Sequence, residues 1–168
     1  MQAGLIALVE RLLDQMADQS APDLIRDFAA AIPVDVIGNL LDIPLADRSQ
    51  LRDWSLAILS ALEPAPAADV LARANAATTD FLHLLQGLVA DRRAHPGDPQ
   101  VDVLTRLIQG DGGENFSESE LLHNCIFLLN AGHETTSNLI GNGMFALMTH
   151  RDQLQRLAGD PTLLTTAV

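Results

Sequence analysis

Two side chains able to handle protons, Glu134 and Thr135, are adjacent in the middle of a long, largely apolar segment. Gly132 and Thr136 belong to the same stretch, although glycine and neighbouring β-branched threonines both lower helix propensity. A carboxylate and a hydroxyl held together in an apolar helix could bind water and relay protons. The composition therefore indicates a functional site at residues 131–136.

One long helix must carry these residues, and we expect it over about 118–149. Ser117 and Glu120 form the pattern of a capping box and mark its start. Apolar residues then continue on nearly all sides, which is typical of a buried helix. At 1.5 Å per residue the helix would be about 48 Å long. Helical spacing gives one shared face to Phe127, Asn130, Ala131, Glu134 and Thr135.

The middle of that helix is expected to be locally irregular. The hydroxyl of Thr135 can bond back to the carbonyl of Ala131, four residues earlier, which tends to bend or open a helix. Ala131 and Gly132 would leave a shallow notch in which a flat ligand could approach the backbone. The sequence thus predicts a hydroxyl, a carboxylate and a loosened carbonyl in one turn.

Residues 131–136, Ala-Gly-His-Glu-Thr-Thr, resemble the oxygen-activation motif of the cytochromes P450, the haem-thiolate monooxygenases. The segment 32–44 resembles the helix that precedes the substrate lid in soluble bacterial members. Segments 138–143 and 152–154 also resemble the family. The resemblance covers essentially the whole chain.

This resemblance implies an all-α fold, the helical core of the cytochrome P450 fold, with about seven helices around one long buried helix. Residues 1–168 would form a single helical domain, with lid helices at about 47–94 and the long central helix at about 118–149. Within the segment 23–41, Pro33 either kinks a helix or opens a second one.

The resemblance also assigns roles to the motif. Thr135 would hydrogen-bond the iron-bound oxygen or its water, and Glu134 would relay protons toward it. The implied haem-binding residues are Ala131, Gly132, Thr135 and Thr136. The implied substrate-pocket residues are Phe127, Asn130 and Ala131. For Asn130 two readings stay open: it bonds a polar group of the substrate or a water, or it satisfies a neighbouring backbone group.

The full-length enzyme would insert one oxygen atom from O₂ into a small apolar substrate. It would use haem iron and electrons from NAD(P)H through a ferredoxin-type donor. In the family, the cysteine that binds the iron follows beyond the equivalent of Val168. We therefore expect this chain to be a truncated interior fragment that binds no haem by itself and is inactive alone.

No residue of the sequence is predicted to bind a metal. Cys125 is expected to be a small buried hydrophobic residue and not an iron ligand. His133 and Glu134 begin like a zinc-protease motif, but Ser137 stands where the second histidine is needed. His133 points away from the shared face, so we expect it to serve packing.

Composition narrows the function classes further. The net charge of −12, with arginine as the only basic residue besides histidine, argues against nucleic-acid binding. No run of about 18 apolar residues is free of polar interruption, and residues 1–6 lack the basic region that is typical of a signal peptide. We expect a cytoplasmic protein without membrane contact.

Two other readings agree less well with the sequence. A haem-free helical interaction module related to the cytochromes P450 should have a degraded motif, whereas residues 131–136 are intact. An ordinary helical bundle with a chance match would not match in the flanking segments as well. Because a slice of a larger fold exposes apolar surface, we also expect self-association.

Overall fold

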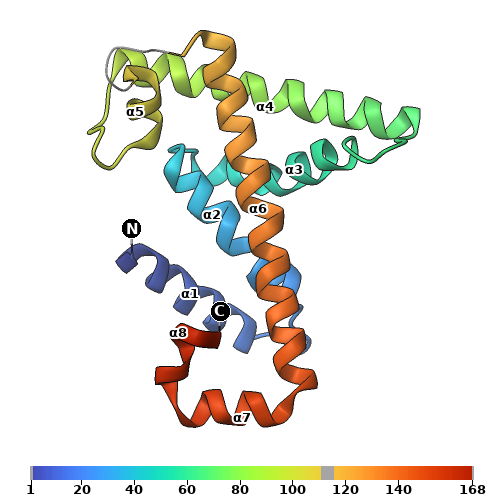
Figure 1. Ribbon diagram of the computed structural model, residues 1–168. Helices are drawn as coiled ribbons and strands as arrows, with labels where there is room; N and C mark the ends of the chain where they lie inside the picture. The colour runs from blue at the N-terminus through green and yellow to red at the C-terminus, as the bar shows by residue number, and fades with distance from the viewer. Residues whose placement is uncertain (1, 111–115, 168) are drawn as a thin grey trace.

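The computed structural model describes residues 2–110 and 116–167, and every regular element in these residues is helical (Figure 1). The predicted all-α class is therefore confirmed. The elements are α1 (Gln2–Ala17), the π-helical turn η1 (Ile25–Ala29), α2 (Ala31–Leu40), the 3₁₀ turn η2 (Leu45–Gln50), α3 (Leu51–Ser60), α4 (Ala68–Ala94), α5 (Val103–Gln109), α6 (Glu118–Thr149), α7 (Arg151–Gly159), the 3₁₀ turn η3 (Pro161–Leu163) and α8 (Leu164–Ala167).

The long helix α6 runs the height of the molecule, with α4 and α3 crossing its upper half and α2 beside its middle (Figure 1). Its start is the predicted capping box: the Ser117 hydroxyl accepts from the backbone N–H of Glu120, and the Glu120 carboxylate accepts from the backbone N–H of Ser117. These bonds satisfy donors that a helix N-terminus otherwise leaves unpaired. The expected bounds of this helix are thus confirmed.

The main core lies where the first half of α6 meets α4. Phe81, Leu85 and Val89 follow one another at intervals of four on α4, and all three are fully buried. The ring of Trp54, from α3, stacks on Phe81 with 5.4 Å between ring centroids. This packing fixes α3 and α4, the two helices expected to form the lid, against α6.

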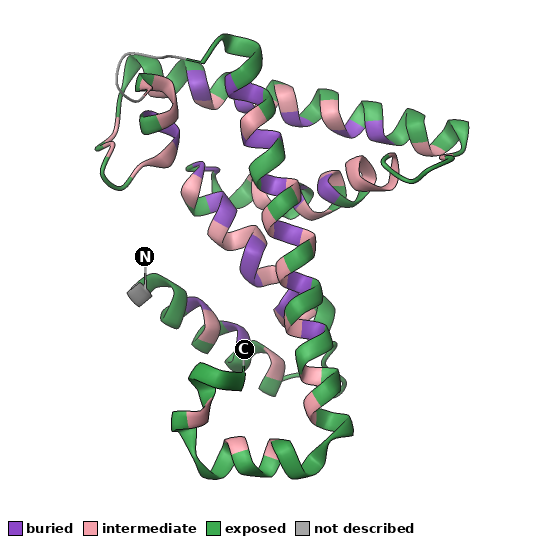
Figure 2. Ribbon diagram, viewed as in Figure 1, coloured by how far each residue is buried: buried purple, intermediate pink, exposed green. Residues whose placement is uncertain are grey.

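Burial of α6 is restricted to one stripe, whereas the sequence led us to expect burial on nearly all sides (Figure 2). Residues 125, 129, 133, 137 and 141 are buried. On other sides Phe127 is 67% exposed, Leu139 64% and Phe145 70%. Hydropathy indicates which residues avoid water, but it does not indicate which element covers them, and the described helices cover one side only.

The segment 23–41 contains two helical pieces. The π-helical turn η1 ends at Ala29, and α2 begins at Ala31, with Ala30 between them. Pro33 lies in the first turn of α2, where a helix needs no N–H donor. Of the two alternatives, Pro33 therefore belongs to the opening of a second segment.

The side chain of Arg48 holds the end of α2 by hydrogen bonds to two backbone carbonyls, an arrangement that we call the arginine clip. Gly38 is buried, and the Arg48 guanidinium lies directly over it. Arg48 Nε donates to the carbonyl of Ile43 at 2.8 Å, and Nη1 donates to the carbonyl of Asp35 at 3.3 Å.

A second hydrophobic cluster joins α1 to α2 through Leu8, Leu12 and Ile32.

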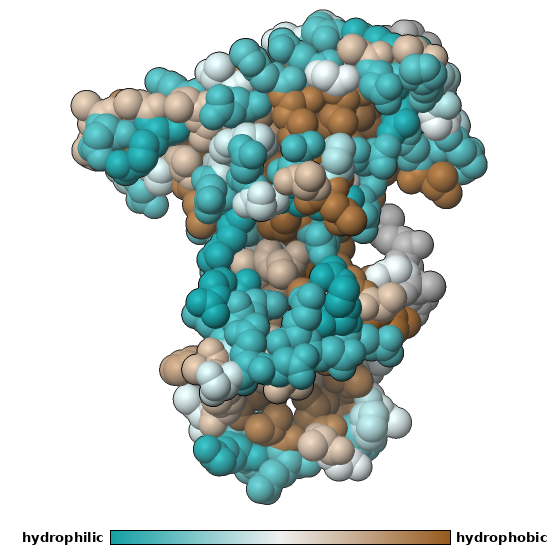
Figure 3. Space-filling view, turned by 180° about the vertical axis from the view of Figure 1, so that it is seen from behind, coloured by the Kyte–Doolittle hydropathy of each residue, from teal (hydrophilic) through white to brown (hydrophobic). Residues whose placement is uncertain are grey.

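No helix in the ranges 2–110 and 116–167 is long and apolar enough to cross a bilayer. The helices α7 and α8 are largely exposed (Figure 2). From behind, hydrophobic side chains border an opening in the lower part of the molecule, where Figure 1 places these two helices (Figure 3).

Candidate functional site

The middle of α6 separates the predicted site residues from the packing residues. Phe127, Ala131 and Thr135 are exposed along one side, while Asn130 and Glu134 are half-buried at its edge. The structure thus brings the five residues of the predicted shared face together. Thr136 is half-buried on the same turn.

Side-chain hydroxyls modify the backbone of this turn at two places. Thr135 Oγ1 donates to the carbonyl of Ala131 at 2.6 Å, as predicted. Ser137 Oγ donates in the same way to the carbonyl of His133 at 2.8 Å, a contact that we did not predict from the sequence. Each hydroxyl shares a carbonyl with the helical ladder, which makes the turn easier to bend than its surroundings.

Gly132 faces the neighbouring helix α2. A Cβ atom added there would lie 3.0 Å from Cδ1 of Ile37. The glycine therefore lets α2 approach α6 closely at the motif. Its expected role in making room for a ligand stays a prediction.

His133 lies on the buried side of the motif, as expected. It is 2% exposed, and its Nδ1 lies 3.2 Å from Oγ of Ser55, a fully buried residue of α3. Burial lowers the pKa of His133, and the positive charge of Arg52 lowers it further. The imidazole is therefore neutral near pH 7. Its Nε2 is buried without a hydrogen-bond partner in the part of the chain that the structure describes.

Asn130 has an unsatisfied oxygen at the edge of the exposed face. Its Oδ1 is buried and has no partner among residues 2–110 and 116–167. The oxygen therefore does not satisfy a neighbouring backbone group there. A buried amide oxygen without a donor is costly, which favours the reading in which Asn130 bonds a ligand or a water.

A family model for cytochrome P450 matches residues 61–160, which include the whole of α4 and the whole motif. The chain belongs to the cytochrome P450 family. The alignment thereby supports the resemblance that residues 131–136 carried.

Relatives of known name match along nearly the whole chain. The biotin biosynthesis cytochrome P450 of Bacillus subtilis (strain 168) is 33% identical over 167 residues, covering 99% of this chain and 42% of that protein. Vitamin D(3) 25-hydroxylase of Pseudonocardia autotrophica is 38% identical over 161 residues, covering 96% and 38%. The chain thus spans about 40% of the length of these relatives.

Solved structures share the fold. A crystal structure of P450BioI in complex with acyl carrier protein ligated to hexadec-9Z-enoic acid aligns with a TM-score of 0.90 at 32% identity, covering 99% of this chain and 42% of that one. The arrangement of α1 to α8 is therefore the cytochrome P450 arrangement.

The exposed face of α6 at residues 127, 131 and 135 fits one face of a haem, and none of these described residues has a side chain that ligates iron. The exposed side of α6 presents an aromatic ring, a methyl group and a hydroxyl at Phe127, Ala131 and Thr135, which suits a flat apolar ring. Cys125 is fully buried on the other side, and burial raises the pKa of its thiol to about 11. It is therefore unsuited to bind iron as a thiolate. No group of three metal-ligating side chains occurs in the described ranges.

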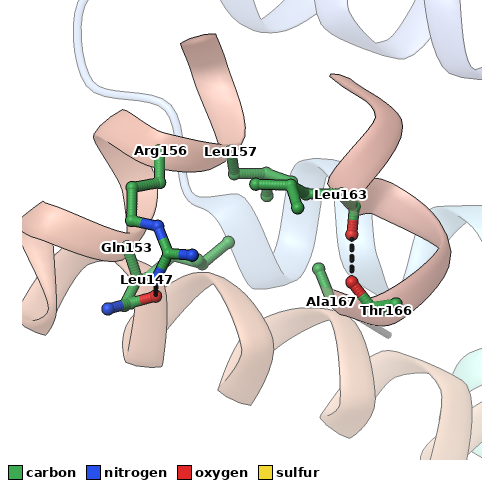
Figure 4. A pocket seen from close by; sticks show the side chains of 7 residues that line it. All are labelled: Leu147, Gln153, Arg156, Leu157, Leu163, Thr166 and Ala167. Atoms are coloured by element: carbon green, nitrogen blue, oxygen red, sulfur yellow. Dashed lines mark hydrogen bonds between the residues drawn. The ribbon is translucent and has the colours of Figure 1, made fainter. Parts of the chain in front are cut away.

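Two hollows in the surface lie away from the motif. One, of about 390 Å³, lies between α1, α2 and the start of α5. The other, of about 270 Å³, is enclosed by the end of α6 and by α7 and α8; Arg156 reaches Gln153 at its rim, and Thr166 bonds to the carbonyl of Leu163 (Figure 4). Neither hollow includes a residue of the motif.

Proposed function

We propose that this chain supplies the oxygen-side wall and the substrate lid of a monooxygenase. The whole enzyme would insert one oxygen atom from O₂ into a small apolar substrate, with electrons from NAD(P)H delivered by a ferredoxin-type donor. One observation carries the proposal: Glu134 and Thr135 lie together at an uncovered, largely apolar face of α6, within an intact family motif.

Haem, when bound, would supply the iron at which dioxygen is activated. Ala131, Gly132, Thr135 and Thr136 would form the wall that faces it, where the small side chain of Ala131 allows close approach. Thr135 Oγ1 already donates to the carbonyl of Ala131 at 2.6 Å, so the oxygen lone pairs of the hydroxyl remain available to accept a proton donor on the open side.

Proton transfer would be the task of the neighbouring carboxylate. Glu134 is half-buried, between the apolar face and solvent. A carboxylate in that position can take a proton from water outside and pass it to a water held by Thr135. The pair would favour oxygen insertion over release of hydrogen peroxide.

Substrate contacts would come from the same face. Phe127, 67% exposed, offers an aromatic surface to an apolar molecule. Asn130 offers its unpartnered amide oxygen to a hydroxyl or an N–H group. We therefore expect an apolar substrate that carries one hydrogen-bond donor.

The alternative, a haem-free interaction module, is less well supported because the motif is intact. The exposed apolar side chains of α6 support self-association of the chain by itself; a monodisperse monomer in analytical ultracentrifugation would contradict this. A cytoplasmic location remains part of the proposal.

Thr135→Ala in the whole haem-containing enzyme that would include this chain, supplied with an electron donor, tests the proposal. The product formed per NAD(P)H is expected to fall roughly 10- to 100-fold, with more hydrogen peroxide, because positioned proton transfer contributes about that much or more. Thr79→Ala is the matched control, since Thr79 makes the same kind of bond, to the carbonyl of Asn75 at 2.9 Å, on an exposed part of α4. Equal product yield in wild type and Thr135→Ala would refute the assigned role.

A further inference from the structure

The contact between His133 and Ser55 joins two helices with different expected tasks. His133 belongs to the motif of α6, and Ser55 belongs to α3, a lid helix under the proposed function. The two residues are 78 positions apart in the sequence, with 3.2 Å between Nδ1 and Oγ. Both side chains are buried, at 2% and 0% exposure, so water does not compete for this bond.

The imidazole depends on this bond. Nε2, the other ring nitrogen of His133, has no partner within the described residues. Ser55 therefore makes the hydrogen bond that orients the ring there. Displacement of α3 would either drag the ring along or leave both ring nitrogens unpaired in a buried site, which is unfavourable.

The stretch of α6 that carries His133 is also the stretch best able to move. The hydroxyls of Thr135 and Ser137 share the carbonyls of residues 131 and 133 with the helical ladder. Helices bend most readily where side chains compete for ladder carbonyls. The turn 131–137 is thus deformable, and on its buried side it is fastened to α3.

We propose that His133 is a positioning residue: through Ser55 it couples the place of the lid helix α3 to the orientation of Glu134 and Thr135. The inference rests on the proposed function for the meaning of lid and motif. The mechanical coupling itself rests on the contact and on the two shared carbonyls. A lid seated on α6 would hold the turn in one orientation, and a displaced lid would release it.

Residue-resolved hydrogen exchange of the purified protein tests the coupling. In Ser55→Ala, amides of residues 133–137 are expected to exchange about tenfold faster, the change in opening equilibrium that follows the loss of one hydrogen bond. Amides of Phe81 and Leu85 in the core of α4 should keep their rates. Ser60→Ala is the matched control, because that hydroxyl lies on the same helix and bonds to the carbonyl of Ala57 at 2.7 Å, without reaching α6.

Two further measurements separate positioning from general stability. In a His133→Phe background, Ser55→Ala should cause no additional acceleration at residues 134–137. In the whole haem-containing enzyme that would include this chain, Ser55→Ala should lower product per NAD(P)H several-fold at unchanged substrate KM, whereas Ser60→Ala should not.

Unchanged exchange in Ser55→Ala, or a uniform rise throughout the protein, would overturn the coupling. Local acceleration together with an unchanged product yield would overturn the positioning role. The exchange experiment needs no oxygenation. If no variant of the whole haem-containing enzyme oxygenates anything, that result counts against the proposed function and leaves the coupling decided by exchange.

Discussion

Replacing Gly38 by alanine should destabilise the protein, although alanine is the better helix former. A Cβ atom at this position would lie 2.5 Å from Nε, 2.7 Å from Cδ and 2.9 Å from Cζ of Arg48. The guanidinium must therefore move. Movement breaks its hydrogen bonds to the carbonyls of Ile43, at 2.8 Å, and Asp35, at 3.3 Å.

The size of the effect follows from two opposing contributions. Alanine gains about 1 kcal/mol over glycine in a helix interior. Loss of two hydrogen bonds from a charged donor, partly replaced by bonds to water, costs about 2–4 kcal/mol. The net loss of unfolding free energy is then about 1–3 kcal/mol. Gly87→Ala on α4, where the added Cβ meets nothing within 4 Å, should instead gain about 1 kcal/mol.

Urea unfolding followed by circular dichroism measures the free energy of unfolding of both variants. The two values can be compared if the m-value is unchanged. The decisive measurement repeats Gly38→Ala in an Arg48→Met background. With the guanidinium gone, the same substitution should become neutral or stabilising, as at Gly87. If Gly38→Ala costs as much without Arg48 as with it, or stabilises the wild type, the clip is not what requires the glycine.

Three further outcomes are expected. Cys125 should react with a thiol reagent at pH 8 at least ~100-fold more slowly in the native protein than in urea, because burial raises the pKa of its thiol to about 11 and so removes most of the thiolate. Burial also lowers the pKa of His133, so that at mildly acidic pH the unfolded chain binds a proton that the folded chain does not. The contribution of this group to the free energy of unfolding is therefore fully present above the usual histidine range, and it falls as the pH drops below about 6.5. His133→Gln should flatten this slope in urea titrations between pH 7 and 5. Gly141→Ala should be less stable than Gly143→Ala by about 1–2 kcal/mol, because its Cβ would meet Cδ1 of Ile25 at 2.4 Å whereas the Cβ at Gly143 meets nothing within 4 Å.

Each of these three predictions would be contradicted by a specific result. Rapid labelling of native Cys125 would show that the start of α6 opens without global unfolding. An identical pH slope in wild type and His133→Gln would assign the proton uptake to other groups. Equal stability of the two glycine variants would mean that Ile25 moves aside at little cost.

The sequence predicted those contacts that a helix makes with itself. The capping box of Ser117 and Glu120 and the bond from Thr135 to Ala131 join residues three and four apart. Helical geometry alone brings such residues together, so their types and spacing suffice. The family resemblance added the order of the helices and the place of the motif.

Contacts between helices could not be read in this way. His133 was expected to serve packing, but its partner Ser55 is a small polar residue in an amphipathic stretch, and nothing in its neighbours marks it as a partner. Likewise nothing in the neighbours of Gly132 along the chain indicates that its Cα faces Ile37 of α2. Which side of α6 each helix covers depends on the whole fold, and the exposure of Phe127 shows the same limit.

The buried stripe of α6 winds around the helix. Residues 125, 129, 133, 137 and 141 advance in steps of four, and four residues turn the helix by about 400°, or 40° beyond one full turn. From first to last the stripe rotates by about 160°. The neighbouring elements therefore pack around α6 in different directions about its axis. Helix α4 packs on it in one direction, α3 and α2 in the next, and η1 in a third. Insertion of a single residue near position 131 would rotate everything beyond it by about 100° and misalign η1 while α4 stayed seated. The spacing of residues along this one helix thus determines how its neighbours are oriented relative to the motif.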